Sequence, residues 1–398
     1  MVYGTGRQLM DILANRLLQH RYQKNLRVLF RRRVKDLVFD NGRVCGCIVL
    51  DEQSGAESEL RCGHVVIASG GITGNLALVR ANWYKPWGDP PEIILNGSQK
   101  TADGNMHELV KTQGGNITHL DKIWNYAAGV NHPSPRHDFH GLSLIPPKNA
   151  LWVNFEGRRI GMPPLITGYD TRYLVERICQ QRHKYSWQIL NFRTAIRELG
   201  VSGSEFNDIL VNPKWYKLLM LKFCGNRQLV DFLVQHCRDF ITANSLNELV
   251  AKMNSLNGDG RVNLDILKVE IESYDANVER GQALFNDDQI RRIQHLRQYS
   301  GDRSRTCKPS KIMDPDGFPL LAIREFIVTR KTLGGIQTDL QCKVLKMDGA
   351  PIPGLFAVGE AAGFGGGGIH GLRALEGTFL GSCIFTGRIV GKAIAEGA

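Results

Sequence analysis

The segment that most constrains this chain of 398 residues is GLFAVGEAAGFGGGGIHGLRALEGTFLGSC, residues 354–383. Ten of its thirty residues are glycine, and the apolar run at 355–358 comes first. Glycine loses more backbone entropy on folding than any other residue, so such density indicates a backbone that must come close to another group. We predict a buried strand, a closely approached loop, and then a helix over 378–395, in which Gly381, Gly387 and Gly391 permit tight packing.

The run GFGGGG at 363–368 matches G-x-G-x-x-G. A dinucleotide-binding loop follows its strand directly, and an acidic residue ends the next strand. Here Gly-Glu-Ala-Ala separates the strand from the glycines, and residues 383–390 contain no Asp or Glu. This interpretation is therefore disfavoured. A flexible surface loop is disfavoured too, because a buried strand precedes the glycines and an apolar helix follows them.

Charge and cysteine usage narrow the class of protein. The formal net charge is +11, and the densest basic stretch is RYQKNLRVLFRRRVK at 21–35. It is either a nucleic-acid or acidic-lipid patch or a set of solvated side chains. Without a nucleic-acid-binding motif we predict solvated side chains and no nucleic-acid partner. No apolar run reaches the ~20 residues that span a membrane. The nine cysteines lack zinc-site spacing, so we predict reduced thiols, no metal and a cytoplasmic location.

Periodicity and turn signals indicate the order of elements. We predict a helix over 7–20 and then a hairpin, because Asn41-Gly42 separates VKDLVFD from RVCGCIVLD. A polar loop, EQSGAESELRCG, leads to a buried strand, HVVIAS. Helices are expected near 74–82 and over 101–116, the second capped by Asp103. The composition changes at about 124, residues 170–300 look mostly helical, and strand signals return at about 325.

Five segments, in order along the chain, resemble the fumarate reductase and 3-ketosteroid dehydrogenase flavoprotein family. They are HVVIASGG, TADGNM, LWVNFEGRRI, TRKTLGGIQTDLQCKVL and the glycine-rich C-terminal segment. The resemblance covers essentially the whole chain and implies an α/β (α+β) fold. It implies an incomplete FAD-binding Rossmann-like domain, residues 1–123 and 326–398, split by an inserted and mostly helical substrate (cap) domain, residues 124–325.

The resemblance also implies FAD as the cofactor. Side-chain-free backbone would approach the edge of the flavin ring, Glu360 would accept hydrogen bonds from the ribityl hydroxyls, and a helix would begin near Gly377-Thr378 with its positive end toward the flavin. Backbone near Val34 would meet the adenine. The implied cofactor-binding residues are Val34, Ser69, Gly70, Gly71, Asp103, Gly104, Gly334, Gly335, Gly359, Glu360, Gly366, Gly367, Gly368, Gly377 and Thr378.

Members of this family move hydride between flavin N5 and a C–C bond next to a carbonyl. We expect Arg330 or Lys331 to stabilise an enolate and Tyr185 to donate a proton. His370 and Arg373 are further catalytic candidates. A solvated strand end, a packed aromatic cluster and a cap on the glycine loop are the alternatives for Arg330-Lys331, Tyr185 and His370. Arg158 and Arg159 are expected to face solvent, and contact with acid groups is the alternative.

Two departures from the family pattern bear on the substrate. Ala374 stands where fumarate-type members align an Arg that grips a carboxylate, which disfavours a dicarboxylate. Leu372 stands near the position of a Tyr in ketosteroid-type members. We therefore predict a small carbonyl-containing substrate and leave the electron acceptor open.

The family begins with a βαβ unit that carries G-x-G-x-x-G, whereas Gly4-Thr5-Gly6-Arg7 does not form this motif. The chain is thus expected to be a truncated or mis-started member. The alternative to an oxidoreductase is a non-catalytic remnant that does not hold FAD alone.

Overall fold

The computed structural model describes residues 5–397 except 169, 213, 304 and 376. The chain divides into two compact units. The first, called here the glycine-loop unit, comprises Gly6–Lys85, Ser98–Trp124 and Arg330–Ala398. The second, the inserted unit, is built mainly from Pro86–Gly97 and Asn125–Thr329. The domain boundaries predicted from the sequence lie after residues 123 and 325. The division of the chain into FAD-binding and substrate domains at these boundaries stays a prediction.

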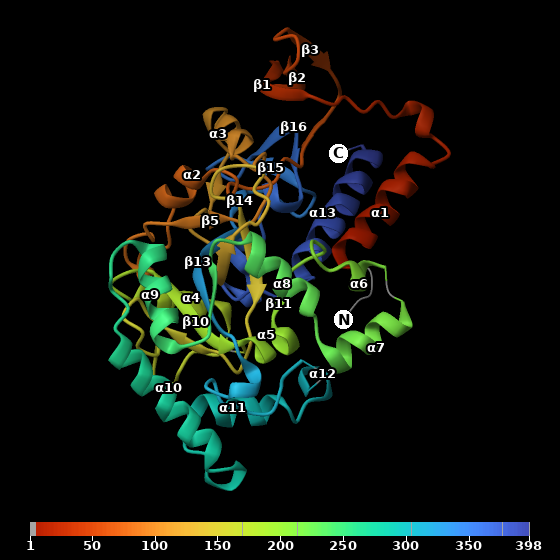
Figure 1. The fold of residues 1–398 in the computed structure, drawn as a ribbon. Coiled ribbons are helices and arrows are strands. Elements are labelled where there is room, and N and C mark those ends of the chain that lie inside the picture. The colour runs from red at the N-terminus through yellow and green to blue at the C-terminus, as the bar shows by residue number, and fades with distance from the viewer. Residues whose placement is uncertain (1–4, 169, 213, 304, 376, 398) are drawn as a thin grey trace. The chain divides into compact units, whose positions relative to one another are not determined.

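The glycine-loop unit holds short sheets and a long C-terminal helix. Its helices are α1 (Thr5–Leu18), α2 (Leu76–Ala81), α3 (Asn105–Thr112) and α13 (Thr378–Ala395), with 3-10 turns η5 (Gly359–Ala361) and η6 (Gly365–His370). Its strands are β1 (Arg32–Asp40), β2 (Arg43–Asp51), β3 (Glu57–Arg61), β4 (Val65–Ile67), β6 (Ile117–Thr118), β14 (Gly335–Ile336), β15 (Lys343–Leu345) and β16 (Pro351–Ala357). Within this unit α13 and α1 run beside each other (Figure 1), and Gly6 approaches Leu380.

The predicted hairpin forms because Asn41 and Gly42 adopt φ of 48° and 76°. These positive values suit the tight turn that matches the twist of two antiparallel strands. Asp40 consequently pairs with Arg43, and β1 and β2 pair along their length. The polar segment predicted as a loop contains β3, which pairs antiparallel with β2 (Figure 1). That prediction was wrong because ESELR lies at a sheet edge, mostly exposed, and so lacks apolar alternation.

The inserted unit has a mixed sheet with helices around it. Its helices are α4 (Thr171–Cys179), α5 (Phe192–Glu198), α6 (Asp208–Val211), α7 (Trp215–Cys224), α8 (Arg227–His236), α9 (Leu246–Asn257), α10 (Leu264–Glu279), α11 (Asp288–Leu296) and α12 (Ser300–Arg303). Its strands are β5 (Ile94–Asn96), β8 (Gly141–Ile145), β9 (Leu151–Val153), β10 (Tyr185–Asn191), β11 (Gly200–Val201), β12 (Phe240–Ala243) and most of β7 (Ile123–Asn131) and β13 (Leu320–Thr332).

This sheet is eight-stranded, with the order β11-β8-β7-β13-β10-β9 and with β12 and β5 also paired to β13. Helices do dominate between α4 and α12, but the sequence analysis did not predict the central sheet. The reason is burial on both faces. Strand β7, with the sequence IWNYAAGVN, is buried at seven of its nine positions, so it shows no alternation of apolar and polar residues.

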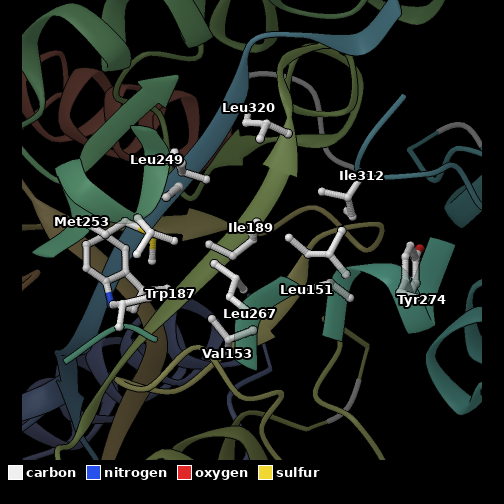
Figure 2. Close-up of a cluster of buried hydrophobic side chains, with 14 of the residues drawn as sticks. Leu151, Val153, Trp187, Ile189, Leu249, Met253, Leu267, Tyr274, Ile312 and Leu320 are labelled. Carbon is white, nitrogen blue, oxygen red and sulfur yellow. The ribbon is translucent and has the colours of Figure 1, made fainter. Parts of the chain in front are cut away.

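A core of the inserted unit lies between β9, β10 and the helices α9 and α10. Figure 2 shows Leu151, Val153 and Ile189 on the strands facing Leu249 and Leu267 on the helices, all five completely buried. Each fully buried side chain of this kind contributes roughly 1.5–3 kcal/mol of hydrophobic free energy. The inserted unit therefore has its own side-chain core.

Three further observations concern the whole described chain. No helix in the described ranges is apolar and long enough to pass through a bilayer. Nor do the described His, Cys, Asp and Glu side chains form a group of three that could bind a metal ion. All nine cysteines are free thiols.

Candidate functional site

Three strand ends meet in the glycine-loop unit. Strand β16 pairs in parallel with β4, and the Val358 N–H donates to the Ile67 carbonyl at 2.9 Å. The strands that lead to Ser69 and Val358 thus belong to one sheet. The end of β13 joins them, because the Ile72 N–H donates to Thr332 Oγ1 at 2.9 Å and the Thr332 N–H donates to Glu360 Oε1 at 2.9 Å. Residues up to 288 positions apart form one polar cluster.

Glycine at position 71 makes this meeting possible. A Cβ there would lie 2.2 Å from Thr332 Oγ1 and 2.9 Å from Glu360 Oε1, closer than any side chain tolerates. Its neighbour Gly70 has φ of +80°, which favours glycine, and Ser69 is exposed. In the predicted segment Ser69-Gly70-Gly71, Gly71 contacts other chain segments, whereas Ser69 faces outward.

Glu360 is mostly buried at the end of β16. Burial raises the pKa of its carboxyl, while the hydrogen bond from the Thr332 N–H and the positive charge of Lys331 oppose part of that rise. Burial and the neighbouring charge thus act on the pKa of this carboxyl in opposite directions.

Part of the glycine loop packs closely against the backbone of its own unit. A Cβ on Gly334 would lie 2.1 Å from the His119 carbonyl, one on Gly335 would lie 2.4 Å from the Ala361 carbonyl oxygen, and one on Gly363 would lie 2.5 Å from the carbonyl carbon of Gly334. The loop is held there because the Phe364 N–H donates to the Leu333 carbonyl at 2.6 Å. Part of the glycine content thus serves contact between segments of the protein.

The remaining glycines differ in what they face. Gly366, Gly367 and Gly368 have φ of 72°, 105° and 52°, and the first two lie against His119 and Leu333. Around a Cβ built on Gly365, Gly371 or Gly377, in contrast, no described atom lies within 4 Å. These three positions leave backbone accessible to a bound molecule.

An aromatic cluster surrounds Lys331. The rings of Trp124 and Phe379 lie 5.7 Å apart, and Lys331 Nζ lies 5.6 Å from the first ring centroid and 5.8 Å from the second. Phe364, from the glycine loop, contacts both rings, and Trp124 Nε1 donates to the Gly371 carbonyl at 3.1 Å. An ammonium over aromatic faces is stabilised by about 0.5–2 kcal/mol. The cluster therefore fixes a positive charge beside the glycine loop.

Helix α13 begins at Thr378, as predicted, with Gly377 at its N-cap in a positive-φ conformation. The Thr378 hydroxyl donates to the Leu375 carbonyl at 2.7 Å. At the preceding strand end, the Gly359 N–H donates to Thr386 Oγ1 at 3.0 Å and links η5 to α13. The tight packing expected at Gly381, Gly387 and Gly391 is absent, since no described atom lies within 4 Å of a Cβ built there.

Arg33 links Asp103, a predicted cofactor-binding residue, to the strand that holds Val34, the residue predicted near the adenine. Arg33 Nη1 pairs with Asp103 Oδ2 at 3.0 Å, and Val34 is its neighbour on β1. Gly104, with φ of +81°, is the N-cap of α3, so the prediction of Asp103 as the cap was one residue early. Asp103 Oδ1 instead accepts from the Asn105 N–H at 3.1 Å.

The other catalytic candidates occupy three places. Arg330 lies on β13, and its carbonyl accepts from the Thr73 hydroxyl at 3.5 Å. His370 ends η6, and its carbonyl accepts from the N–H of the exposed Arg373 at 3.1 Å. Tyr185 belongs to the inserted unit, on strand β10 instead of a helix, where its hydroxyl accepts from Asn257 Nδ2 at 2.8 Å.

Burial raises the pKa of Tyr185 to about 12, so this phenol stays protonated at neutral pH. Arg159 was wrongly expected to face solvent. Its side chain is 10% exposed and pairs with Asp287 at 2.6 Å. This ion pair is internal to the inserted unit.

Comparison with known proteins shows which family this chain belongs to. The FAD binding domain family matches residues 1–380. A KsdD-like steroid dehydrogenase of Mycobacterium tuberculosis is 39% identical over 416 aligned positions, which cover 100% of this chain and 72% of the relative. A KsdD-like steroid dehydrogenase of Mycolicibacterium smegmatis is also 39% identical, over 96% of this chain and 71% of the relative.

This chain belongs to the FAD binding domain family. Its cofactor is FAD, and by family it is an FAD-dependent oxidoreductase of the ketosteroid dehydrogenase and fumarate reductase group. Solved structures agree on the fold. A 3-ketosteroid delta1-dehydrogenase from Sterolibacterium denitrificans aligns with a TM-score of 0.64 at 16% identity, over 95% of this chain and 61% of that one. A flavocytochrome c3 fumarate reductase aligns with a TM-score of 0.60 at 20% identity, over 92% and 52%.

The residues present fit FAD. The accessible backbone of Gly365, Gly371 and Gly377 suits the edge of a flat ring. The first turn of α13 carries a partial positive charge, which favours a reduced flavin anion. Buried Glu360 supplies an acceptor for hydroxyl groups. Sequence reasoning missed Trp124, Phe364 and Phe379, which surround Lys331, because no spacing signal links aromatic residues 240 positions apart.

Proposed function

We propose that this protein is an FAD-dependent dehydrogenase that acts on a C–C bond adjacent to a carbonyl of a small ketone. Bound FAD supplies a group that accepts or donates hydride. The observation that carries the proposal is the convergence of three strand ends, the glycine loop and the first turn of α13 within one unit. The inserted unit is the proposed substrate domain. A cytoplasmic location is part of the proposal, and the nine free thiols support it.

Lys331 is the residue that we assign to the substrate carbonyl. Removing a proton from the carbon next to a carbonyl places negative charge on the carbonyl oxygen, and a fixed positive group stabilises it. The ammonium of Lys331 is held over Trp124 and Phe379 and so is fixed before substrate arrives. Arg330, His370 and Arg373 remain candidates for positioning the substrate, and Tyr185 for the partner proton.

A ketosteroid is the proposed substrate class. Two mycobacterial relatives that are 39% identical are named KsdD-like steroid dehydrogenases. Ala374 replaces the Arg that would hold a carboxylate in fumarate-type members, and an apolar ring system needs no such group. The aromatic faces around Lys331 offer apolar surface next to a charge, which suits a ketone on a hydrophobic skeleton.

The test uses the purified protein loaded with FAD. We expect a visible flavin absorption band, bleaching of that band by a 3-ketosteroid without oxygen, and turnover with an artificial electron acceptor. The matched 3-hydroxysteroid, which lacks the ketone, should not react, and fumarate should not oxidise the dye-reduced protein. Protein that stays colourless after incubation with FAD contradicts the cofactor assignment, whereas turnover of fumarate alone contradicts the substrate class.

A further inference from the structure

A cavity of about 510 Å³ lies within the inserted unit. Helices α5 and α7, the residue after α11, Arg303 and residues 305–310 line it. All of its lining residues belong to Asn125–Thr329, so none of the FAD-binding candidates lines it. Its volume falls within the range of roughly 300–1,000 Å³ that is common for small-molecule sites. The cavity is therefore formed by the inserted unit alone.

The cavity is strongly basic. Six cationic side chains line it, namely Arg193, Arg197, Arg297, Arg303, Arg305 and Lys308, and no Asp or Glu is among the described lining residues. Arg193 is ion-paired with Asp314. Arg297 donates to the Thr306 carbonyl and Arg303 Nε donates to the Arg297 carbonyl at 2.8 Å, bonds that orient guanidinium groups without neutralising them.

Acidic groups near the cavity do not balance this charge. The carboxylate of Glu198 already accepts from the Lys148 N–H at 2.7 Å and the Asn149 N–H at 3.1 Å. Asp302 lies near Arg305 and acts on it electrostatically. With Asp314 these are three carboxylates against six lining cations among the described residues, so the described lining carries net positive charge.

Thr306 gives an independent indication of a ligand. It lines the cavity and is 3% exposed, yet its Oγ1 has no hydrogen-bond partner among the described residues. A buried hydroxyl without a partner is unfavourable, and native proteins rarely retain one. An acceptor oxygen of a bound molecule would satisfy it.

We propose that this cavity binds the phosphate groups of a small anionic ligand. Guanidinium groups match phosphate oxygens through paired N–H donors. Arg197 from α5, Arg297 after α11 and Lys308 approach from separate segments, which suits an ion that offers oxygens in several directions. The Thr306 hydroxyl contributes a further donor at the wall.

Calorimetric titration of the FAD-loaded full chain with sodium pyrophosphate, at constant ionic strength, tests this. We expect saturable binding. Arg197→Ala and Lys308→Ala should each weaken it about 10-fold, the usual effect of losing one charge-assisted hydrogen bond. Lys268→Ala, on the exposed face of α10, is the matched control and should leave the affinity unchanged. Absence of binding, or equal affinity in all three variants, overturns the proposal.

Thr306→Val keeps the shape of the side chain and removes only the hydroxyl. We expect an unchanged or higher Tm without ligand and weaker pyrophosphate binding, whereas a merely structural role would lower the Tm and leave the affinity unchanged. Binding to vesicles of phosphatidic acid with phosphatidylcholine shows whether the phosphate group belongs to a lipid or to a soluble ligand. Variant-sensitive binding to them assigns a lipid headgroup, and binding to pyrophosphate alone assigns a soluble ligand. Succinate binding as tightly as pyrophosphate overturns the preference for phosphate.

Discussion

Around the glycine loop, chain segments of the glycine-loop unit meet backbone to backbone, whereas around β9 and β10 the segments of the inserted unit meet through large side chains. At Gly334, Gly335 and Gly363 the nearest foreign atoms are carbonyl and amide atoms, 2.1–2.9 Å from where a Cβ would stand. In the inserted unit, Trp187, Leu267 and other fully buried side chains fill the space between β9, β10, α9 and α10 (Figure 2).

The difference teaches how each unit tolerates change. A side-chain core loses part of its packing when a residue is shortened, and its neighbours relax to some extent. A backbone contact has no such freedom, because any added atom displaces a whole segment. We therefore expect single substitutions to be more disruptive at the glycine contacts than in the core.

Gly334→Ala should have the largest effect. Its Cβ would lie 2.1 Å from the His119 backbone, so β13, the glycine loop or residues 118–119 must move. We expect loss of more than ~4 kcal/mol of stability and purification without bound flavin, measured by urea unfolding and the visible spectrum. The matched control is Gly381→Ala on α13, where no described atom lies within 4 Å. It should be neutral or stabilise the helix by up to ~1 kcal/mol. Equal behaviour of the two variants would contradict the comparison.

Leu267→Ala tests the inserted unit. Leu267 is completely buried in the core, so the substitution should lower the free energy of unfolding by about 2–5 kcal/mol. Val269→Ala on the same helix, at a position 63% exposed, should change it by less than about 0.5 kcal/mol. Urea midpoints of both variants measure this. A small effect of Leu267→Ala would show that this core contributes little to the stability of the inserted unit.

Lys331→Met separates chemistry from folding in the glycine-loop unit. Removing the fixed charge should lower kcat with a ketosteroid about 10²–10³-fold and leave flavin bound. Because Lys331 also lowers the pKa of Glu360, the variant should raise that pKa further. Lys392→Met, near the exposed end of α13, should keep full activity. Unchanged kcat in Lys331→Met would remove this residue from the mechanism.

Glu325→Gln tests a buried carboxyl group of the inserted unit. Glu325 is completely buried on β13, and burial holds its pKa well above the ordinary value of 4.5. The carboxyl therefore takes up a proton when the chain folds. The free energy of unfolding should fall by about 1.4 kcal/mol per pH unit as the pH rises from the ordinary pKa toward the raised pKa of the folded protein. Gln does not ionise, so the variant should lack this fall, whereas the exposed control Glu272→Gln should retain it. Tm values of the wild-type protein and both variants from about pH 5 to pH 8 measure this. Parallel Tm profiles of the wild-type protein and Glu325→Gln would contradict the proposed burial.

Tyr185→Phe should have the smallest effect. It removes the acceptor of the Asn257 hydrogen bond, so we expect a loss of about 1 kcal/mol in the free energy of unfolding. Tyr299→Phe, at a position 69% exposed, is the control. A fall in kcat beyond that explained by stability supports Tyr185 as the proton donor, and an unchanged kcat assigns it to packing.

Local features of this protein were readable from its sequence. The Asn41-Gly42 turn, the bounds of α13 and the strand before Ser69 follow from residues within a few positions of one another. The family segments likewise led to FAD and to the class of oxidoreductase. Such signals depend on backbone preference and periodicity, and these act over a turn of helix or a pair of strands.

The tertiary structure alone decided which distant residues meet. The contact of Gly71, Thr332 and Glu360, the rings around Lys331, and the basic cavity around Thr306 join segments that no local pattern links. The sheet of the inserted unit escaped prediction for a related reason. Strands buried on both faces lose the alternation that marks a strand, so their partners emerge only when the chain packs.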